Sequence, residues 1–183
     1  MKNFKLNRED ALFLFVDIQD KLLVAIENAK EVEKNSKILA EVSTITEIPS
    51  LITLQYPKGL GPMTESVRQH IKDGIELEKI HFSSMEDDEI RKTLKEKGKR
   101  QIILCGIEAH ICIFQTARGL IENGYEVFLV SDAVGSRKQS NQKNALQMMG
   151  EMGCVITNTE TILFDIAGVA GTEEFKKLQN LIK

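Results

Sequence analysis

The sequence predicts a doubly wound α/β fold, in which helices cover both faces of a mostly parallel sheet. Two observations lead to this prediction. Continuous apolar runs such as ALFLFVD (11–17) and QIILCG (101–106) lack the alternation of a half-exposed strand, so they fit strands buried on both faces. Stretches with helical spacing separate these runs, as parallel β-α-β units require. A chain of 183 residues fits one domain, expected to span residues 1–183.

The individual elements follow from apolar runs, helical spacing and turn residues. The expected strands are 11–17, 49–55, 76–80, 101–106, 125–132 and 154–158. The expected helices are 20–47 with a break near 28–29, 63–71, 86–97, 110–123, 138–152, 160–167 and 172–182. The stretch YPKGLGP (56–62) is rich in glycine and proline and is expected to form a loop. Gly98 is expected to end the helix before it, because glycine adopts the left-handed conformation at a helix terminus.

Composition limits the classes of function. The net charge is −3 and the isoelectric point about 5.7, so no basic surplus indicates binding to nucleic acid or to an anionic membrane. No apolar run approaches the roughly 18 residues of a membrane span. The run ALFLFV (11–16) is also shorter than the roughly 7–15 residues of a signal-peptide core. Three cysteines without a CxxC pair suit a reducing compartment, and we expect a cytoplasmic protein.

Three reactive residue types stand near the ends of expected strands. Asp17 ends the first apolar run, Lys79 lies in the third, and Cys112 follows the fourth at the start of a helix. Ligands bind at the carboxyl ends of strands in open parallel sheets, so these residues should share one rim. A thiol attacks as its thiolate, which a helix start and Lys79 would stabilise, and Asp17 could accept the proton. Such a trio supports nucleophilic catalysis on a carbonyl.

Each residue also has a simpler explanation when considered alone. Free cysteines are most often buried in packing, which is the expected role of Cys105 and Cys154. Asp17 could cap a helix, because aspartate is a common capping residue. Lys79 could be an ordinary solvated surface lysine.

Taken together, these motifs resemble those of the isochorismatase-like cysteine hydrolases, a superfamily that includes nicotinamidases. Asp17 in VDIQD matches the family's first-strand D-x-Q motif, and Lys79 in EKIHFSS matches a lysine followed by an aromatic residue and a serine. Cys112 in GIEAHICI matches the cysteine loop that begins with glycine, and SDAVGSR (131–137) matches a further block. The resemblance covers residues 10–165 and implies the Rossmann-like fold of this family.

The resemblance implies a role for each residue of the site. Cys112 would be the nucleophile, Asp17 the general base and later acid, and Lys79 the electrostatic orienter. The family has a cis peptide bond in the cysteine loop, and here it would join Ile107 and Glu108. The backbone N–H groups of Glu108 and Cys112 would form the oxyanion hole.

One departure from the family narrows the substrate class. Nicotinamidases hold a metal with an Asp-x-His pair after the second strand and a further histidine. Here that position reads LQYPKGLGP (54–62), which has neither residue type, and His70 and His81 lack metal-ligand spacing. We therefore expect no metal and no cofactor. The chain resembles most closely the metal-free subgroup of YcaC-related and isochorismatase-domain-containing proteins, whose physiological substrates are largely undefined.

Four further residues are candidates for the substrate pocket because they lie near the same rim. They are Gln19, Tyr56, Phe82 and His110. Ordinary packing is the alternative for each, and His110 could also cap the following helix.

The sequence therefore predicts a cysteine hydrolase that cleaves a small amide-like or ester-like molecule through a thioester acyl-enzyme. Its partners are expected to be this small molecule and further copies of the chain, in a dimer or larger homo-oligomer. Two alternatives stay open. Cys112 could serve a thiol redox protein, with Cys105 or Cys154 as its partner thiol. The fold could also belong to a catalytically silent oligomeric binding protein.

Overall fold

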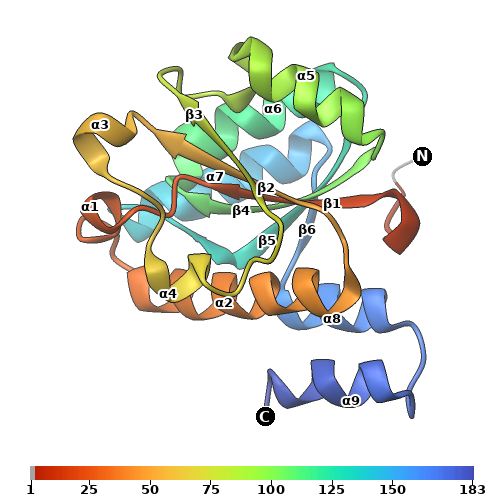
Figure 1. The fold of residues 1–183 in the computed structure, drawn as a ribbon. Coiled ribbons are helices and arrows are strands. Elements are labelled where there is room, and N and C mark those ends of the chain that lie inside the picture. The colour runs from red at the N-terminus through yellow and green to blue at the C-terminus, as the bar shows by residue number, and fades with distance from the viewer. Residues whose placement is uncertain (1–2) are drawn as a thin grey trace.

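A parallel sheet lies between two layers of helices in the computed structural model, which describes residues 3–183 (Figure 1). Within these residues the sheet has six strands in the order β3-β2-β1-β4-β5-β6, and each pairing is parallel. The strands are β1 (Ala11–Val16), β2 (Ser50–Gln55), β3 (Ile75–Lys79), β4 (Gln101–Ile107), β5 (Glu126–Gly135) and β6 (Val155–Thr157). The predicted doubly wound α/β class is confirmed.

The helices divide between the two faces of the sheet. One face carries α2 (Ala29–Thr46), α8 (Thr159–Ala167) and α9 (Glu173–Asn180), and the other carries α5 (Asp88–Lys97), α6 (Phe114–Glu122) and α7 (Gln139–Met152). Short helical segments lie in the connections: α1 (Asp20–Leu23), α3 (Pro57–Leu60), α4 (Glu65–Arg68), Arg8–Asp10, Ser84–Glu86 and the π-helical turn Ala109–Ile113. None of the helices in the described part of the chain is long and apolar enough to cross a bilayer.

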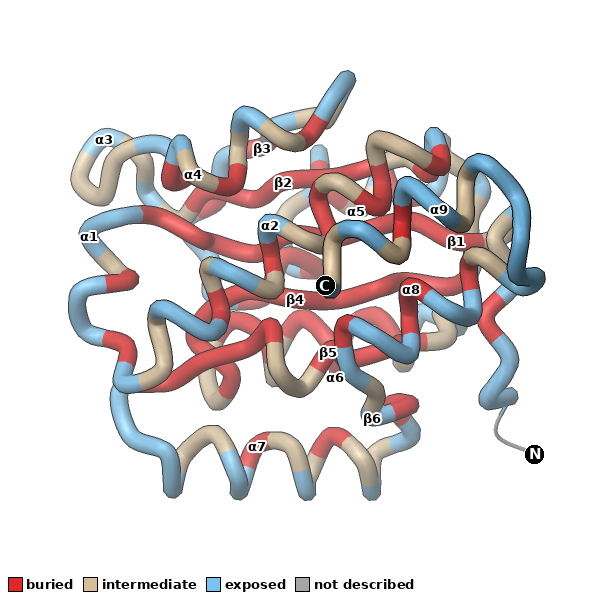
Figure 2. The backbone as a smooth tube through the Cα atoms, turned by 90° about the horizontal axis from the view of Figure 1, so that it is seen from below, coloured by how far each residue is buried: buried red, intermediate tan, exposed pale blue. Residues whose placement is uncertain are grey.

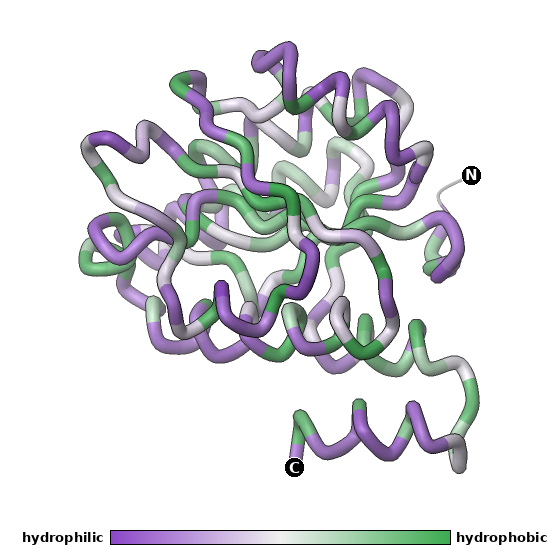
Figure 3. The backbone as a smooth tube through the Cα atoms, viewed as in Figure 1, coloured by the Kyte–Doolittle hydropathy of each residue, from purple (hydrophilic) through white to green (hydrophobic). Residues whose placement is uncertain are grey.

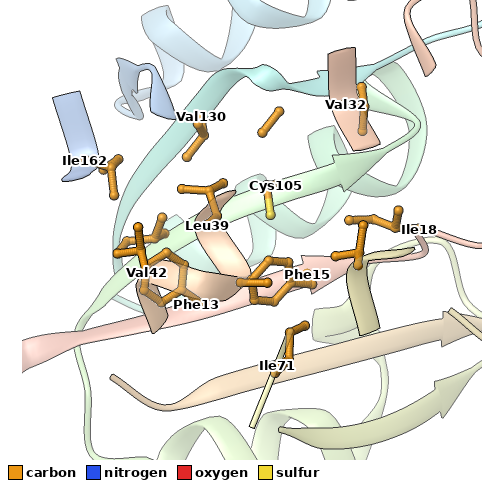
Figure 4. Packing of buried hydrophobic residues seen from close by; sticks show 14 of the residues in the cluster. Phe13, Phe15, Ile18, Val32, Leu39, Val42, Ile71, Cys105, Val130 and Ile162 are labelled. Atoms are coloured by element: carbon orange, nitrogen blue, oxygen red, sulfur yellow. The ribbon is translucent and has the colours of Figure 1, made fainter. Parts of the chain in front are cut away.

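The central strands carry the core. Figure 2 shows β1 and β4 buried along their length, and Figure 3 shows hydrophobic residues concentrated in the sheet. Phe13 and Phe15 face α2 together with Cys105, and their rings stack with centroids 6.0 Å apart (Figure 4). Leu12 and Leu14 point to the opposite face, against α5 and α6. Burial of each such side chain contributes about 1.5–3 kcal/mol, which explains why these runs do not alternate.

Two of the expected elements were wrong because residues at helix starts were overlooked. The expected loop 56–62 contains α3, because Pro57 stands at the first helical position, where its fixed φ favours a helix. The helix expected over 86–97 begins at Asp88, because the Asp87 carboxylate accepts hydrogen bonds from the N–H groups of the first turn. Its predicted end is right, since Gly98 follows in the left-handed conformation with φ 64°.

Strand β5 is longer than the expected 125–132. Its pairing with β4 shifts register after Leu104, and the ladder then resumes with Gly106 opposite Val134. The strand therefore continues to Gly135, past the charge of Asp132. The helix expected over 110–123 also differs, because the π-helical turn precedes α6.

Gly106 allows β1 and β4 to approach each other closely beneath the rim. Its φ is +124°, and a Cβ there would lie 2.0 Å from the carbonyl oxygen of Val16. Val16 directly precedes Asp17, and Gly106 belongs to the loop that leads to Cys112. The glycine thus lets two candidate catalytic segments leave the sheet side by side.

We expect Gly106→Ala to lower the free energy of unfolding by more than about 3 kcal/mol, because the methyl group meets backbone and not a movable side chain. Gly98→Ala is the matched control: its φ is also positive, but nothing lies within 4 Å of the added Cβ. It should cost about 1 kcal/mol. Urea denaturation of both variants measures the difference, and equal losses would contradict the close-approach argument.

Candidate active site

The three candidate catalytic residues come from three segments that meet at the carboxyl end of the sheet. Asp17 directly follows β1, Lys79 is the last residue of β3, and Cys112 lies in the π-helical turn after β4. The strand order reverses between β1 and β4, and ligands in open α/β sheets bind at such a switch point.

Asp17 is fully buried and is held through both its backbone and its carboxylate. Its φ is 56°, a left-handed conformation that aspartate tolerates better than most residues. Its N–H donates to the carbonyl of Thr53 at 3.0 Å, and the Thr53 hydroxyl donates to Oδ1 at 2.9 Å. Burial raises the pKa of Asp17 above its ordinary value and outweighs the opposing charge of Lys79. The carboxylate is therefore a stronger base than a solvated aspartate.

The Lys79 ammonium is enclosed by oxygen acceptors. Nζ donates to Asp17 Oδ2 at 2.6 Å and to Gln55 Oε1 at 2.7 Å, and both side chains of the ion pair are fully buried. The carbonyls of His81 and Phe82 each lie 3.3 Å from Nζ. A buried charge requires such partners, so Lys79 is not the solvated surface lysine of the simpler explanation.

Gln55 is a site residue that the sequence analysis missed. It ends β2 and lies opposite Lys79 in the β2–β3 register. Its Oε1 accepts from Lys79, and its Nε2 donates to the carbonyl of Ile80 at 2.9 Å. The sequence offered one indication, because Gln55 is a polar residue at the end of an apolar run. Only the strand register shows that Gln55 lies opposite the lysine.

The Cys112 thiol interacts with the Asp17 carboxylate and with the preceding loop, where the backbone N–H of Glu108 favours the thiolate form. The pKa of Cys112 is raised to about 12, mainly by burial and next by the negative charge of Asp17, against the attraction of Lys79. The thiol is therefore protonated near neutral pH. This geometry favours transfer of its proton to Asp17 over a standing thiolate beside Lys79.

Glu108 connects this loop to the segment after β5. The peptide bond between Ile107 and Glu108 is cis. The Glu108 side chain, 8% exposed, accepts hydrogen bonds from Arg137 Nη2 at 2.6 Å, from the Arg137 backbone N–H at 3.1 Å and from Arg137 Nε. Burial raises the pKa of Glu108, but the hydrogen bonds and charge of Arg137 reverse this and leave it below its ordinary value. The sequence analysis missed Arg137, although it ends the SDAVGSR block.

A cavity of about 570 Å³ opens beside the Cys112 sulfur. Most of its wall is aliphatic or aromatic, and the polar contributors are Gln55, Glu108, Cys112 and Arg137. The apolar lining residues are Leu22, Tyr56, Leu60, Ile80, Phe82, Ile107 and Ile111. The volume lies within the range of about 300–1,000 Å³ that is usual for small-molecule sites.

The structure places two of the four expected pocket residues at this cavity. Tyr56 and Phe82 line it and are each about half exposed. Gln19 does not line it: its buried amide bonds to Gln55 N, Gln55 O and Gly61 O, so it bridges backbone behind the site. His110 also turns away, because its ring nitrogens contact Ser136 Oγ and Asn141 Nδ2.

The isochorismatase domain family matches residues 11–161, which include all three candidate catalytic residues. The chain belongs to the isochorismatase-like hydrolase family. The resemblance predicted from the sequence is therefore confirmed. The isochorismatase domain-containing protein 2 of Danio rerio is 35% identical over 184 residues, covering 97% of this chain and 89% of the fish protein.

Solved structures of related proteins have the same fold. The MAR1 ribonuclease of Caenorhabditis elegans has a TM-score of 0.91 and 32% identity, and the match covers 97% of this chain and 92% of that one. The YcaC gene product of Escherichia coli, described as an octameric hydrolase of unknown specificity, has a TM-score of 0.93. It is 22% identical, with 100% and 91% coverage, so this likeness shows the isochorismatase-like fold alone.

Within the described residues no group of three or more His, Cys, Asp or Glu side chains is arranged to hold a metal ion. The absence of a metal and of a cofactor stays a prediction.

We expect Asp17→Asn to make Cys112 more reactive toward alkylation, because the charge of Asp17 helps to raise the pKa of the thiol. A fall of one pKa unit means about tenfold more thiolate, so iodoacetamide should label Cys112 about tenfold faster at pH 8. Thr53→Val is the control, since it removes a hydrogen bond to Asp17 but no charge. Peptide mass spectrometry separates Cys112 from Cys105, and slower labelling in Asp17→Asn would contradict the assignment.

The Glu108–Arg137 pair should make stability depend on pH. The folded pKa of Glu108 is lowered, so its contribution is present above the unfolded pKa of about 4.3 and is lost as the pH falls through the folded value. Arg137→Gln should lower Tm by about 2–4 °C at pH 7 and by less than about 1 °C at pH 3.

Arg100→Gln is the matched control for this experiment, because Arg100 forms an exposed ion pair with Asp10. Its Tm should change little at either pH. Thermal melting followed by circular dichroism gives the comparison, and an equal loss for Arg137→Gln at both pH values would mean that charge pairing is not its role.

Proposed function

We propose that the chain is a cysteine-dependent hydrolase of a small amide or ester, acting through a thioester on Cys112. One observation carries this proposal: a buried thiol interacts with a carboxylate that is itself held by a buried ammonium, and the cysteine lines a cavity. Nucleophile, base and orienting group in mutual contact are the arrangement that activates a thiol for attack.

Acylation begins when the Cys112 sulfur attacks the substrate carbonyl carbon and its proton passes to Asp17. The raised pKa of Asp17 suits this role, because a general base works best when its pKa approaches the working pH. Lys79 stays paired with Asp17 and fixes the direction of its second oxygen.

The carbonyl oxygen becomes negative as the sulfur attacks. In our proposal the backbone N–H groups of Glu108 and Cys112 donate to it. The Glu108 N–H is already directed at the sulfur, so a carbonyl bound there lies within its reach. Loss of one such donor typically costs a factor of about 10²–10³ in kcat.

The cycle closes without a cofactor. Asp17 returns the proton to the leaving amine as the carbon–nitrogen bond breaks. A water molecule then attacks the thioester, Asp17 takes its proton, and the thiol regains a proton as the acid leaves.

The redox alternative has less support from the positions of the other cysteines. Cys105 packs on the α2 face of the sheet, whereas Cys112 packs on the α6 face. Burial also raises the pKa of the Cys105 thiol well above its usual value. Cys154 precedes β6 and so stands at the amino-terminal edge of the parallel sheet, opposite the rim that holds Cys112. Mild peroxide followed by mass spectrometry would test for a disulfide or stable sulfenic acid.

The name of the nematode neighbour describes a ribonuclease, but the features of this chain support a different substrate. Its net charge is −3, and the cavity wall is mainly apolar. Phosphate backbones are usually bound by clusters of Lys and Arg, which this cavity does not offer within the described residues.

We also propose a homo-oligomer in the cytoplasm. The octameric description of YcaC supports assembly. The free thiols of Cys105 and Cys112 suit a reducing compartment. Light scattering gives the mass of the assembly, and a monomer at working concentration would refute the proposed homo-oligomer.

Cys112→Ala should abolish amide hydrolysis and leave the melting temperature within a few degrees of the wild type, because a small buried side chain is replaced by a smaller one. Incubation of the wild type with an amide library should add the acyl mass to the Cys112 peptide. Cys105→Ala controls for loss of a buried thiol away from the cavity. Undiminished turnover in Cys112→Ala would end the proposal, and so would acyl mass on another residue.

A further inference from the structure

We propose that the cavity selects a neutral substrate with an apolar acyl chain and rejects one whose acyl chain carries a carboxylate. This inference rests on the proposed hydrolysis at Cys112, whose sulfur borders the cavity. It concerns the part of the substrate that stays on the sulfur after the amine has left.

The apolar part of the wall comes from several separate segments. Leu22 belongs to α1, Leu60 to α3, and Ile80 follows β3, while Ile107 and Ile111 belong to the cysteine loop. Apolar surface therefore reaches the cavity from several directions. An acyl chain placed there loses contact with water over much of its length, and this stabilises the bound state.

The charged groups near the sulfur are already paired with each other. Lys79 is fully buried and donates to Asp17 and Gln55, and it is not among the described residues that line the cavity. Arg137 Nη2 lies 2.6 Å from Glu108 Oε1, so the two side chains cancel each other's charge.

A substrate carboxylate would therefore meet no unpaired cation in the described wall. Arg137 lines the cavity, but its Nε and Nη2 groups donate to the Glu108 carboxylate, which offsets the attraction that Arg137 offers a substrate carboxylate. The substrate carboxylate would also approach the negative charge of Glu108 itself. Removing a carboxylate from water without a partner costs far more than an apolar group gains, so the acyl chain must be uncharged.

A matched pair of amides tests this selection. Succinamate and 4-methylpentanamide have the same shape at the acyl end, where two carboxylate oxygens replace two methyl groups. We expect kcat/KM to favour 4-methylpentanamide by at least about 100-fold, given the cost of an unpaired carboxylate. Along the series ethanamide, butanamide and hexanamide, kcat/KM should rise about fourfold for each added methylene.

A positive charge at the mouth of the cavity should weaken the discrimination against a substrate that carries a carboxylate. Ile80 lines the cavity and is 72% exposed, so Ile80→Lys places an ammonium at the mouth without burying it. We expect the preference for 4-methylpentanamide over succinamate to shrink about tenfold or more, mainly through faster succinamate turnover. Ile156→Lys is the control, because Ile156 is 41% exposed on β6, away from the site, and the ratio should not change.

Binding to Cys112→Ala protein, measured by calorimetry, separates the acyl preference from the chemistry. If the wild type hydrolyses none of these amides but the variant binds the longer neutral ones more tightly, the proposed hydrolysis is wrong and the selection stands. Equal or better binding of succinamate would overturn the selection and would indicate that Arg137 recognises substrate carboxylates. The proposed selection would also be overturned if neither kcat/KM nor binding affinity depended on the length of the acyl chain.

Discussion

The buried ion pair between Lys79 and Asp17 is the constraint on which the rest of the site depends. Its atoms lie 2.6 Å apart with both side chains fully buried. Withdrawing two charges from water costs several kcal/mol per ion, so the pair persists only with further hydrogen bonds. Thr53 and Gln55 supply them from β2, the strand that lies between the two partners in the sheet. Polar residues at the ends of apolar strands therefore belong to one network.

The same pair determines the resting state of the thiol. Burial and the neighbouring Asp17 carboxylate both raise the pKa of Cys112, so the sulfur keeps its proton. A protonated thiol reacts slowly with oxidants and alkylating agents, because the thiolate is the reactive species. In the proposed mechanism the nucleophile is generated only when a carbonyl is in place to receive it, which would protect a cysteine that lines an open cavity.

Much of the architecture could be predicted from the sequence, because strands buried on both faces must be apolar without alternation. The motifs around Asp17, Lys79 and Cys112 located the candidate site for a similar reason, as each stands where a strand ends. Gln55 and Arg137 were missed because their roles depend on cross-strand register and on side-chain direction, which no local pattern encodes. Gln19 was misplaced for the same reason, since its amide turns toward backbone.

The position of Lys79 on β3 has a consequence for how the activity can be lost. Within the described sheet β3 lies at an edge and is bonded only to β2, so one side of the strand lacks a neighbour. Edge elements detach at a lower free energy than central ones. Fraying of this single strand would withdraw the ammonium and leave the carboxylate unbalanced, while the helices and central strands stayed folded. We therefore expect the proposed activity to be less robust than the fold itself, and mild denaturants should abolish it first.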